Sequence, residues 1–65
     1  MTVDEIQVRI KDIESRRDDD ETAHSMEDSL WCDVLQAIAD GHENPSEIAR
    51  LALTTSKIDF ARWCA

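Results

Sequence analysis

Apolar residues recur every three or four positions in the first part of the chain, between residues 3 and 17. They are Val3, Ile6, Ile10 and Ile13. At about 100° per residue, these side chains share a narrow arc, as in a helix that packs against one neighbour. The pattern predicts a helix over 3–17 that carries Val8 on the opposite side, and Thr2 and Glu5 have the spacing of a capping box at its start.

A second helix is predicted over 20–40, with Asp18 or Asp19 as its N-cap and Gly41 as the left-handed residue that ends it. Its apolar positions cover about half of the helix circumference. They are Ala23, Met26, Leu30, Trp31, Val34, Leu35, Ala37 and Ile38. So wide an apolar surface needs more than one neighbour, so this helix must contact further helices from its own chain or from a partner.

Two short helices are expected after the glycine. Asn44 as N-cap, Pro45 at the first helical position and Glu47 in the first turn predict a helix over 45–54. A second cap-like sequence at residues 56–59 predicts a short helix over 57–64.

The predicted fold is all-α: an antiparallel helical hairpin, 3–17 and 20–40, followed by two short helices. One glycine, one proline and no tyrosine suit helices better than turn-rich sheets. A length of 65 residues allows one domain, 1–65, with little apolar area to spare. A homodimer is therefore one of the expected possibilities.

The net charge of −8 is concentrated in one part of the chain. Residues 18–43 contain nine acidic side chains and no lysine or arginine. This balance argues against direct nucleic-acid binding, which requires a basic surface. The acidic run at 18–21 is best explained as helix capping, because it lacks the spacing and glycine of a calcium-binding loop.

The chain is expected to be cytoplasmic. Met1 precedes acidic residues rather than a basic and apolar leader, and no apolar run approaches the roughly 20 residues that span a bilayer. Cys32 and Cys64 are therefore predicted to be free thiols. Neither is expected to act as a nucleophile. His24 lies about 12 Å from Cys32 along the helix, and spacing leaves His42 open as a base for Cys64, but nothing supplies an oxyanion hole.

Glu21 and His24 have the i, i+3 spacing of helical di-iron sites, and Asp28 follows one turn later. Such a site needs two copies of the motif, which only a symmetric dimer would supply. Single motif matches are often false positives. We therefore predict no metal, no cofactor and no enzymatic activity, and keep these three residues as weak candidates.

Glu27 and His24 interrupt the apolar arc of the second helix. A buried carboxylate requires a partner such as Arg17 or Arg50, or it marks a surface left open for another molecule. The favoured interpretation is that both side chains reach solvent at the edge of the bundle. The candidate partner-binding residues are Glu27, Asp28, Trp31, Asp33, Phe60 and Trp63.

Three segments carry a resemblance to a known group of proteins. They are Asp20-Glu21-x-Ala23-His24-Ser25-x-Glu27-Asp28-x-Leu30, Asp33-Val34-Leu35-x-x-Ile38-Ala39-x-Gly41 and Ile58-Asp59-Phe60-x-Arg62-Trp63-Cys64-Ala65. With them the chain resembles short acidic proteins encoded by phages or prophages of actinobacteria. The resemblance implies a host cytoplasmic setting and transfers no activity or catalytic residue.

The favoured functional hypothesis is a small non-enzymatic protein-interaction module. The resemblance adds a specific form of it, a phage-encoded modulator of a host protein, because very small phage proteins often bind host proteins. Two alternatives stay open: an acidic DNA mimic that inhibits a nucleic-acid-binding protein, and a metal-binding helical dimer.

Overall fold

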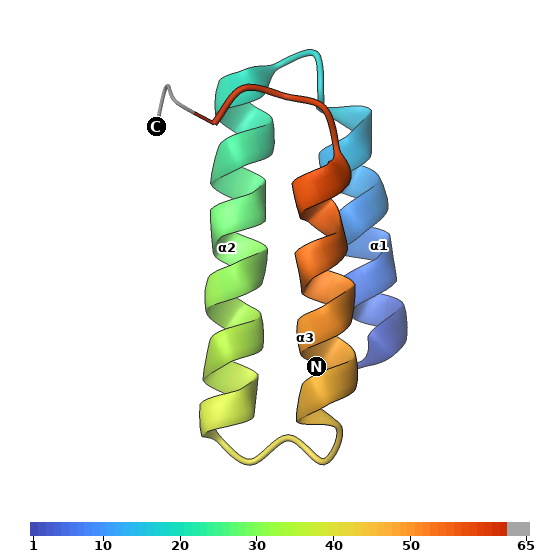
Figure 1. Ribbon diagram of the computed structural model, residues 1–65, viewed down its shortest axis with the longest axis vertical. Helices are drawn as coiled ribbons and strands as arrows, with labels where there is room; N and C mark the ends of the chain where they lie inside the picture. Colours follow the sequence, from blue (N-terminus) through green and yellow to red (C-terminus); the bar gives the residue numbers. More distant parts are fainter. Residues whose placement is uncertain (63–65) are drawn as a thin grey trace.

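The computed structural model describes residues 1–62, and this part of the chain forms helices and no strand (Figure 1). The elements in order are α1 (Val3–Ser15), α2 (Asp20–Ala39), α3 (Pro45–Leu53) and a short 3-10 helix (Thr54–Lys57). The all-α prediction is confirmed.

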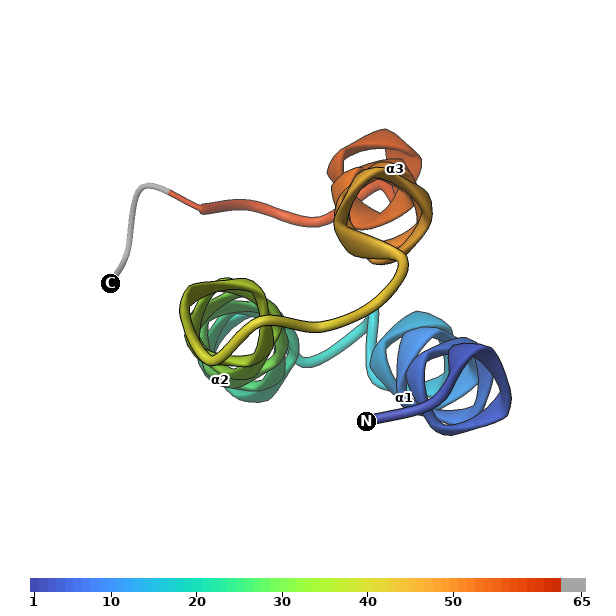
Figure 2. The same ribbon diagram turned by 90° about the horizontal axis from the view of Figure 1, so that it is seen from below.

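The three α-helices pack against one another in pairs. Viewed end-on, they occupy the corners of a triangle, and the chain beyond the 3-10 helix runs from α3 across to α2 (Figure 2). The predicted hairpin of α1 and α2 is present, and α3 lies beside both of them (Figure 1). We call residues 58–62 the crossing segment.

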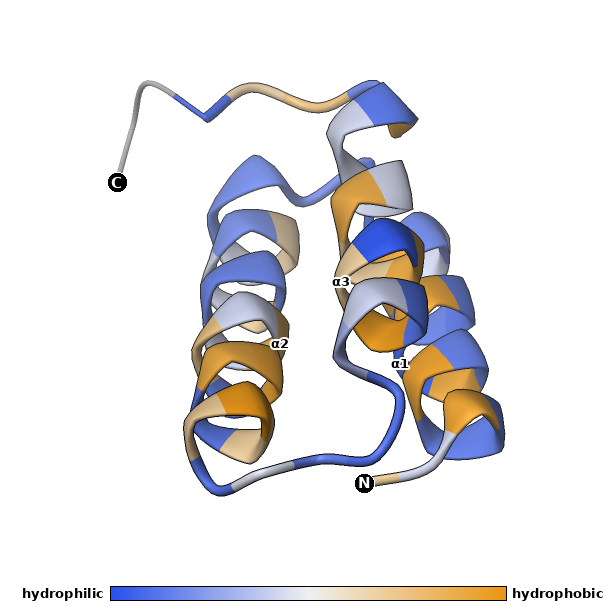
Figure 3. Cartoon of the chain, turned by 60° about the horizontal axis from the view of Figure 1, so that its bottom comes forward, coloured by the Kyte–Doolittle hydropathy of each residue, from blue (hydrophilic) through white to orange (hydrophobic). Residues whose placement is uncertain are grey.

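The core lies between the helices and contains Ile6 and Ile13 of the predicted seam of α1, whereas Val3 and Ile10 are only partly buried. Its buried apolar residues are Ile6, Ile13, Ala23, Leu30, Val34, Ile48, Ala52 and Phe60. Val8 points away from the core and is 59% exposed, as predicted. In α2 the hydrophobic residues concentrate toward the C-terminal half (Figure 3).

Three predicted helix boundaries are confirmed by their local geometry. Thr2 caps α1 by accepting a hydrogen bond at Oγ1 from the Glu5 amide at 3.1 Å. Asp19, rather than Asp18, caps α2. Gly41 follows α2 with a φ of +90°, a conformation that L side chains rarely adopt.

The start of α3 differs in detail from the prediction. Asn44 is the N-cap and Pro45 opens the helix, but the Asn44 side chain makes no capping hydrogen bond. His42 orders this loop instead. Its Nδ1 accepts from the Asn44 amide at 3.0 Å, so Nε2, 2.7 Å from the Met1 carbonyl oxygen, carries the proton in the neutral ring.

Two predicted helical stretches are wrong. Helix α1 ends at Ser15, so Arg16 and Arg17 lie in the turn that follows. A helix was also predicted over 57–64. Of the described residues in this range, Lys57 ends the 3-10 helix and residues 58–62 are not helical.

The reason for the second error is a competing use of backbone carbonyls. Arg62 donates hydrogen bonds to the carbonyl oxygens of Thr55, Ile58 and Phe60. A continuing helix would have used the first two carbonyls for its own hydrogen bonds. The guanidinium therefore stabilises an extended path. Trp63 and Cys64 lie outside the described residues.

The core assignment can be tested by removing one methylene from α1. Replacing the buried Ile13 with valine should lower the free energy of unfolding by about 1 kcal/mol, because a well-packed core cannot fully close the space. Urea denaturation followed by circular dichroism measures the change. Val8→Ala on the exposed side of the same helix should stay within about 0.5 kcal/mol of the wild type. Equal effects of the two substitutions would contradict the assignment.

Candidate functional site

A bidentate ion pair joins α2 to the crossing segment. Nε of Arg62 donates to Oε1 of Glu27 at 2.8 Å, and a terminal guanidinium nitrogen donates to Oε2 at 3.0 Å. Glu27 is 2% exposed, and its side chain is more deeply buried than that of Arg62. The fixed fork of the guanidinium matches the two carboxylate oxygens, which suits a buried pair.

Further contacts hold the crossing segment over α2. The guanidinium carbon of Arg62 lies 3.9 Å from the centre of the Phe60 ring, a cation–π contact. Phe60 is buried in the core. The backbone amide of Ala61 donates to Oδ1 of Asp20, at the start of α2, at 3.1 Å. The crossing segment is thus attached to two successive parts of α2.

The environment of Glu27 keeps its carboxylate ionised. Burial raises its pKa, but hydrogen bonds with Arg62 and Thr55 and the charges of Arg62 and His24 outweigh this effect. The pKa of Glu27 therefore lies below its ordinary value. The hydrogen bond with Glu27 raises the pKa of Arg62, so both members of the pair stay charged at neutral pH.

The structure overturns the favoured interpretation of Glu27. Its side chain does not reach solvent at the edge of the bundle, and its partner is neither Arg17 nor Arg50, both of which are exposed. The sequence held one usable signal. Arg62 is the only charged residue between Phe60 and Ala65, just as Glu27 is a charged exception on the apolar arc of α2.

His24 is half-buried next to this pair. Its Nε2 lies 3.4 Å from Oδ1 of Asp28, whereas Nδ1 is buried and has no hydrogen-bond partner among residues 1–62. Glu21, the third weak metal candidate, is exposed. Within the described chain, no three histidine, cysteine or acidic residues are gathered closely enough to hold a metal ion.

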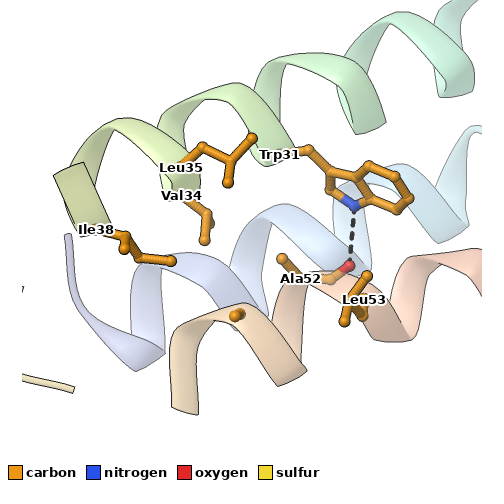
Figure 4. A pocket seen from close by; sticks show the side chains of 7 residues that line it. Trp31, Val34, Leu35, Ile38, Ala52 and Leu53 are labelled. Carbon is orange, nitrogen blue, oxygen red and sulfur yellow. Dashed lines mark hydrogen bonds between the residues drawn. The ribbon is translucent and has the colours of Figure 1, made fainter. Parts of the chain in front are cut away.

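A second feature is an apolar groove between α2 and α3 (Figure 4). Its volume is about 210 Å³. We call it the α2–α3 groove, and its lining residues are Trp31, Val34, Leu35, Ile38, Ala49, Ala52 and Leu53. Leu35 and Leu53 are 67% and 58% exposed, so one large apolar side chain on each helix remains in solvent.

Trp31 is held in a fixed orientation within this groove. Its indole Nε1 lies 3.0 Å from the Ala52 carbonyl oxygen (Figure 4) and 2.9 Å from the Thr55 hydroxyl oxygen. The Thr55 hydroxyl itself donates to the Ala52 carbonyl at 3.0 Å. The polar edge of the indole is thus satisfied inside the protein, and its apolar surface lines the groove.

The candidate partner-binding residues separate into three groups. Trp31 borders the groove and Asp28 is exposed on the same helix. Glu27 and Phe60 are buried, so they cannot form a contact surface. Asp33 lies on the side of α2 that faces α1.

Asp33 is bound there by Arg9, whose terminal nitrogen lies 2.7 Å from its Oδ2. Trp63, the sixth candidate, lies outside the described residues.

The two exposed leucines of the groove were not among the candidates. The sequence placed Leu35 on the apolar arc of α2 and predicted that this arc is too wide for one neighbour. It could not show that α3 leaves part of the arc uncovered. Leu53 gave no comparable signal, because a leucine near the end of a short helix fits a buried position equally well.

The acidic residues of 18–43 do not form one uniform surface. Asp20, Glu27 and Asp33 are engaged by the crossing segment and by α1, and Asp19 caps α2. A DNA mimic requires carboxylates spaced like phosphates across one face. These internal contacts remove support from that alternative.

In comparisons with known proteins, no family model, no curated protein and no solved structure matches this chain. Among the helices of the described residues, none is long and apolar enough to cross a membrane.

The Glu27–Arg62 pair predicts a specific loss of stability in acid. Because the pKa of Glu27 is lowered by folding, its contribution is complete above the ordinary value of 4.5 and disappears as the pH falls through the lower folded value. Unfolding free energies are measured from pH 7 to pH 3. Below pH 4.5, the unfolding free energy should fall less steeply with pH in Glu27→Gln than in the wild type. Glu43→Gln, at an exposed loop position, is the control and should keep the wild-type slope. Parallel curves for wild type and Glu27→Gln would contradict the prediction.

The same pair predicts that the single variant Arg62→Met is less stable than the double variant that also replaces Glu27. Arg62→Met should lower the unfolding free energy by about 3 kcal/mol, because it leaves a buried carboxylate unpaired. The double variant Glu27→Met, Arg62→Met should recover part of this loss, because no buried charge is left unpaired, while the hydrogen bonds of Arg62 to three carbonyl oxygens stay lost. Thermal unfolding of the four proteins measures both effects. Arg16→Met removes an exposed arginine and should change little; a similarly small effect of Arg62→Met would refute the role of the pair.

Proposed function

We propose that this chain is a non-enzymatic protein-interaction module that binds another protein through the α2–α3 groove. The observation that carries the proposal is the exposure of Leu35 and Leu53 on either side of a groove lined by apolar residues and the tryptophan ring. Contiguous exposed apolar surface on a small protein is typical of contact sites. The resemblance to phage-encoded proteins supports a host protein as the partner.

The fixed orientation of Trp31 supports this function. Aromatic side chains that are already ordered before binding lose little conformational entropy in a complex, which makes them effective anchors. The two hydrogen bonds of the indole hold the ring in place. A partner would therefore meet a groove that is already formed.

The groove also suits a helical partner. Trp31 and Ile38 are seven residues apart on α2, so the apolar lining extends over about 10 Å along the helix axis. Two turns of an amphipathic helix have the same length and present apolar residues at positions i, i+3 or i+4, and i+7. Both exposed leucines would contact such a helix.

The groove offers little for catalysis. Its lining side chains are aliphatic, apart from an indole whose N–H is already used. General acid–base or nucleophilic chemistry needs a titratable or nucleophilic group within hydrogen-bond distance of the reacting atom. The proposal of binding rather than catalysis rests on this chemistry.

Affinity capture with matched variants tests the proposed function. Immobilised wild type should retain a protein from an actinobacterial lysate at low and at high salt, because apolar contacts are not screened. Leu35→Asp should reduce retention of that protein at least about tenfold, as expected for loss of a buried anchor.

The control is Val8→Asp, which introduces the same charge at a comparably exposed apolar residue on α1. It should retain the same protein as the wild type. Equal retention by wild type and Leu35→Asp, or no retained protein at either salt concentration, would refute the proposal.

A further inference from the structure

The side of α2 and α3 that carries the groove is not covered by α1. None of the residues that line the groove belongs to α1, although α1 packs against both other helices. On α2, the exposed residues Cys32 and Ala39 lie beside Leu35 and extend the uncharged surface. Two helices thus present one continuous apolar layer to solvent.

The charged residues next to this layer have opposite signs on the two helices. Asp28 precedes Leu35 by two turns on the same side of α2 and is exposed. Arg50 precedes Leu53 by one turn on α3, is exposed, and has no ion-pair partner among the residues that the structure describes. The layer therefore has one acidic side chain at its α2 border and one basic side chain at its α3 border.

We infer that a second copy of this chain covers the α2–α3 groove, in a two-fold symmetric dimer. A two-fold axis that runs along the groove places α2 of one copy over α3 of the other. Asp28 of each copy then lies on the side where its partner carries Arg50, and the leucines of both copies enter one shared apolar layer. A surface with opposite charges on its two borders is self-complementary in this way, as a two-fold contact requires.

The size of the chain supports the same conclusion. A stable dimer buries about 800 Å² on each copy. The chain has 4476 Å² of accessible surface, so this contact needs only a minor part of it. A domain of 65 residues has a small core. In the dimer, α2 and α3 of the two copies would pack as four helices and bury additional apolar surface between them.

The net charge of −8 does not oppose this contact directly. The acidic run at 18–21 lies at the start of α2, whereas the groove begins at Trp31, ten residues after Glu21, which is about 15 Å along the helix axis. Repulsion between exposed charges falls off over about 8 Å at physiological salt. The inference rests on the proposed function in one respect, because both use the same contact surface. A host protein that bound the groove would displace the second copy.

Sedimentation equilibrium of the full chain, with a thiol reductant to exclude a Cys32 disulfide, tests the dimer. The wild type should sediment with twice the monomer mass of 7.4 kDa at high protein concentration and dissociate on dilution. Leu35→Asp and Leu53→Asp should each weaken association at least about tenfold. Val8→Asp should not, and circular dichroism confirms that every variant is folded.

A charge-reversal pair tests the two-fold arrangement itself. Asp28→Arg and Arg50→Asp should each weaken the dimer, and the double variant should restore it, because the opposite charges face each other again. A wild type that stays monomeric up to millimolar concentration would overturn the inference, as would a double variant no stronger than the single ones. A monomeric wild type whose capture of a host protein depends on Leu35 would leave the proposed function standing.

Discussion

The burial of Glu27 on α2 and the path of the crossing segment depend on one long-range ion pair, between Glu27 and Arg62. Without the guanidinium, a carboxylate that is 2% exposed would have to be desolvated alone, at a cost of several kcal/mol. The same guanidinium binds the carbonyl oxygens of Thr55, Ile58 and Phe60, and so determines the path of the chain after the 3-10 helix. One side chain thus satisfies a buried charge and shapes the backbone that carries it.

Local features of the sequence predicted most of the helical structure. The seam of α1, the caps at Thr2 and Asp19 and the glycine after α2 all depend on residues within a few positions of one another. Hydrophobic periodicity and capping chemistry describe such short-range relations well. The wide apolar arc of α2 also predicted that this helix needs several neighbours, and α1, α3 and the crossing segment all contact it.

The errors arose where a residue distant in sequence decides the outcome. Glu27 was expected to reach solvent because polar residues on an apolar arc usually do so at the edge of a bundle, and the predicted terminal helix followed from a local cap-like pattern. Arg62 lies 35 positions after Glu27 and changes both results. Likewise, Leu35 and Leu53 become a contact surface only through the spacing between α2 and α3. Neither the pair nor the groove can be deduced from periodicity, because both arise from how distant elements pack.

The position of Arg62 also has a consequence for synthesis of the chain. While α1, α2 and α3 emerge from the ribosome, the carboxylate of Glu27 lacks its native partner Arg62, and Phe60 does not yet fill its place in the core. Burial of α2 in its final form therefore has to wait until residue 62 has been made. Until then the nascent chain keeps this part of α2 in water, so the fold is completed only after all three α-helices have been made.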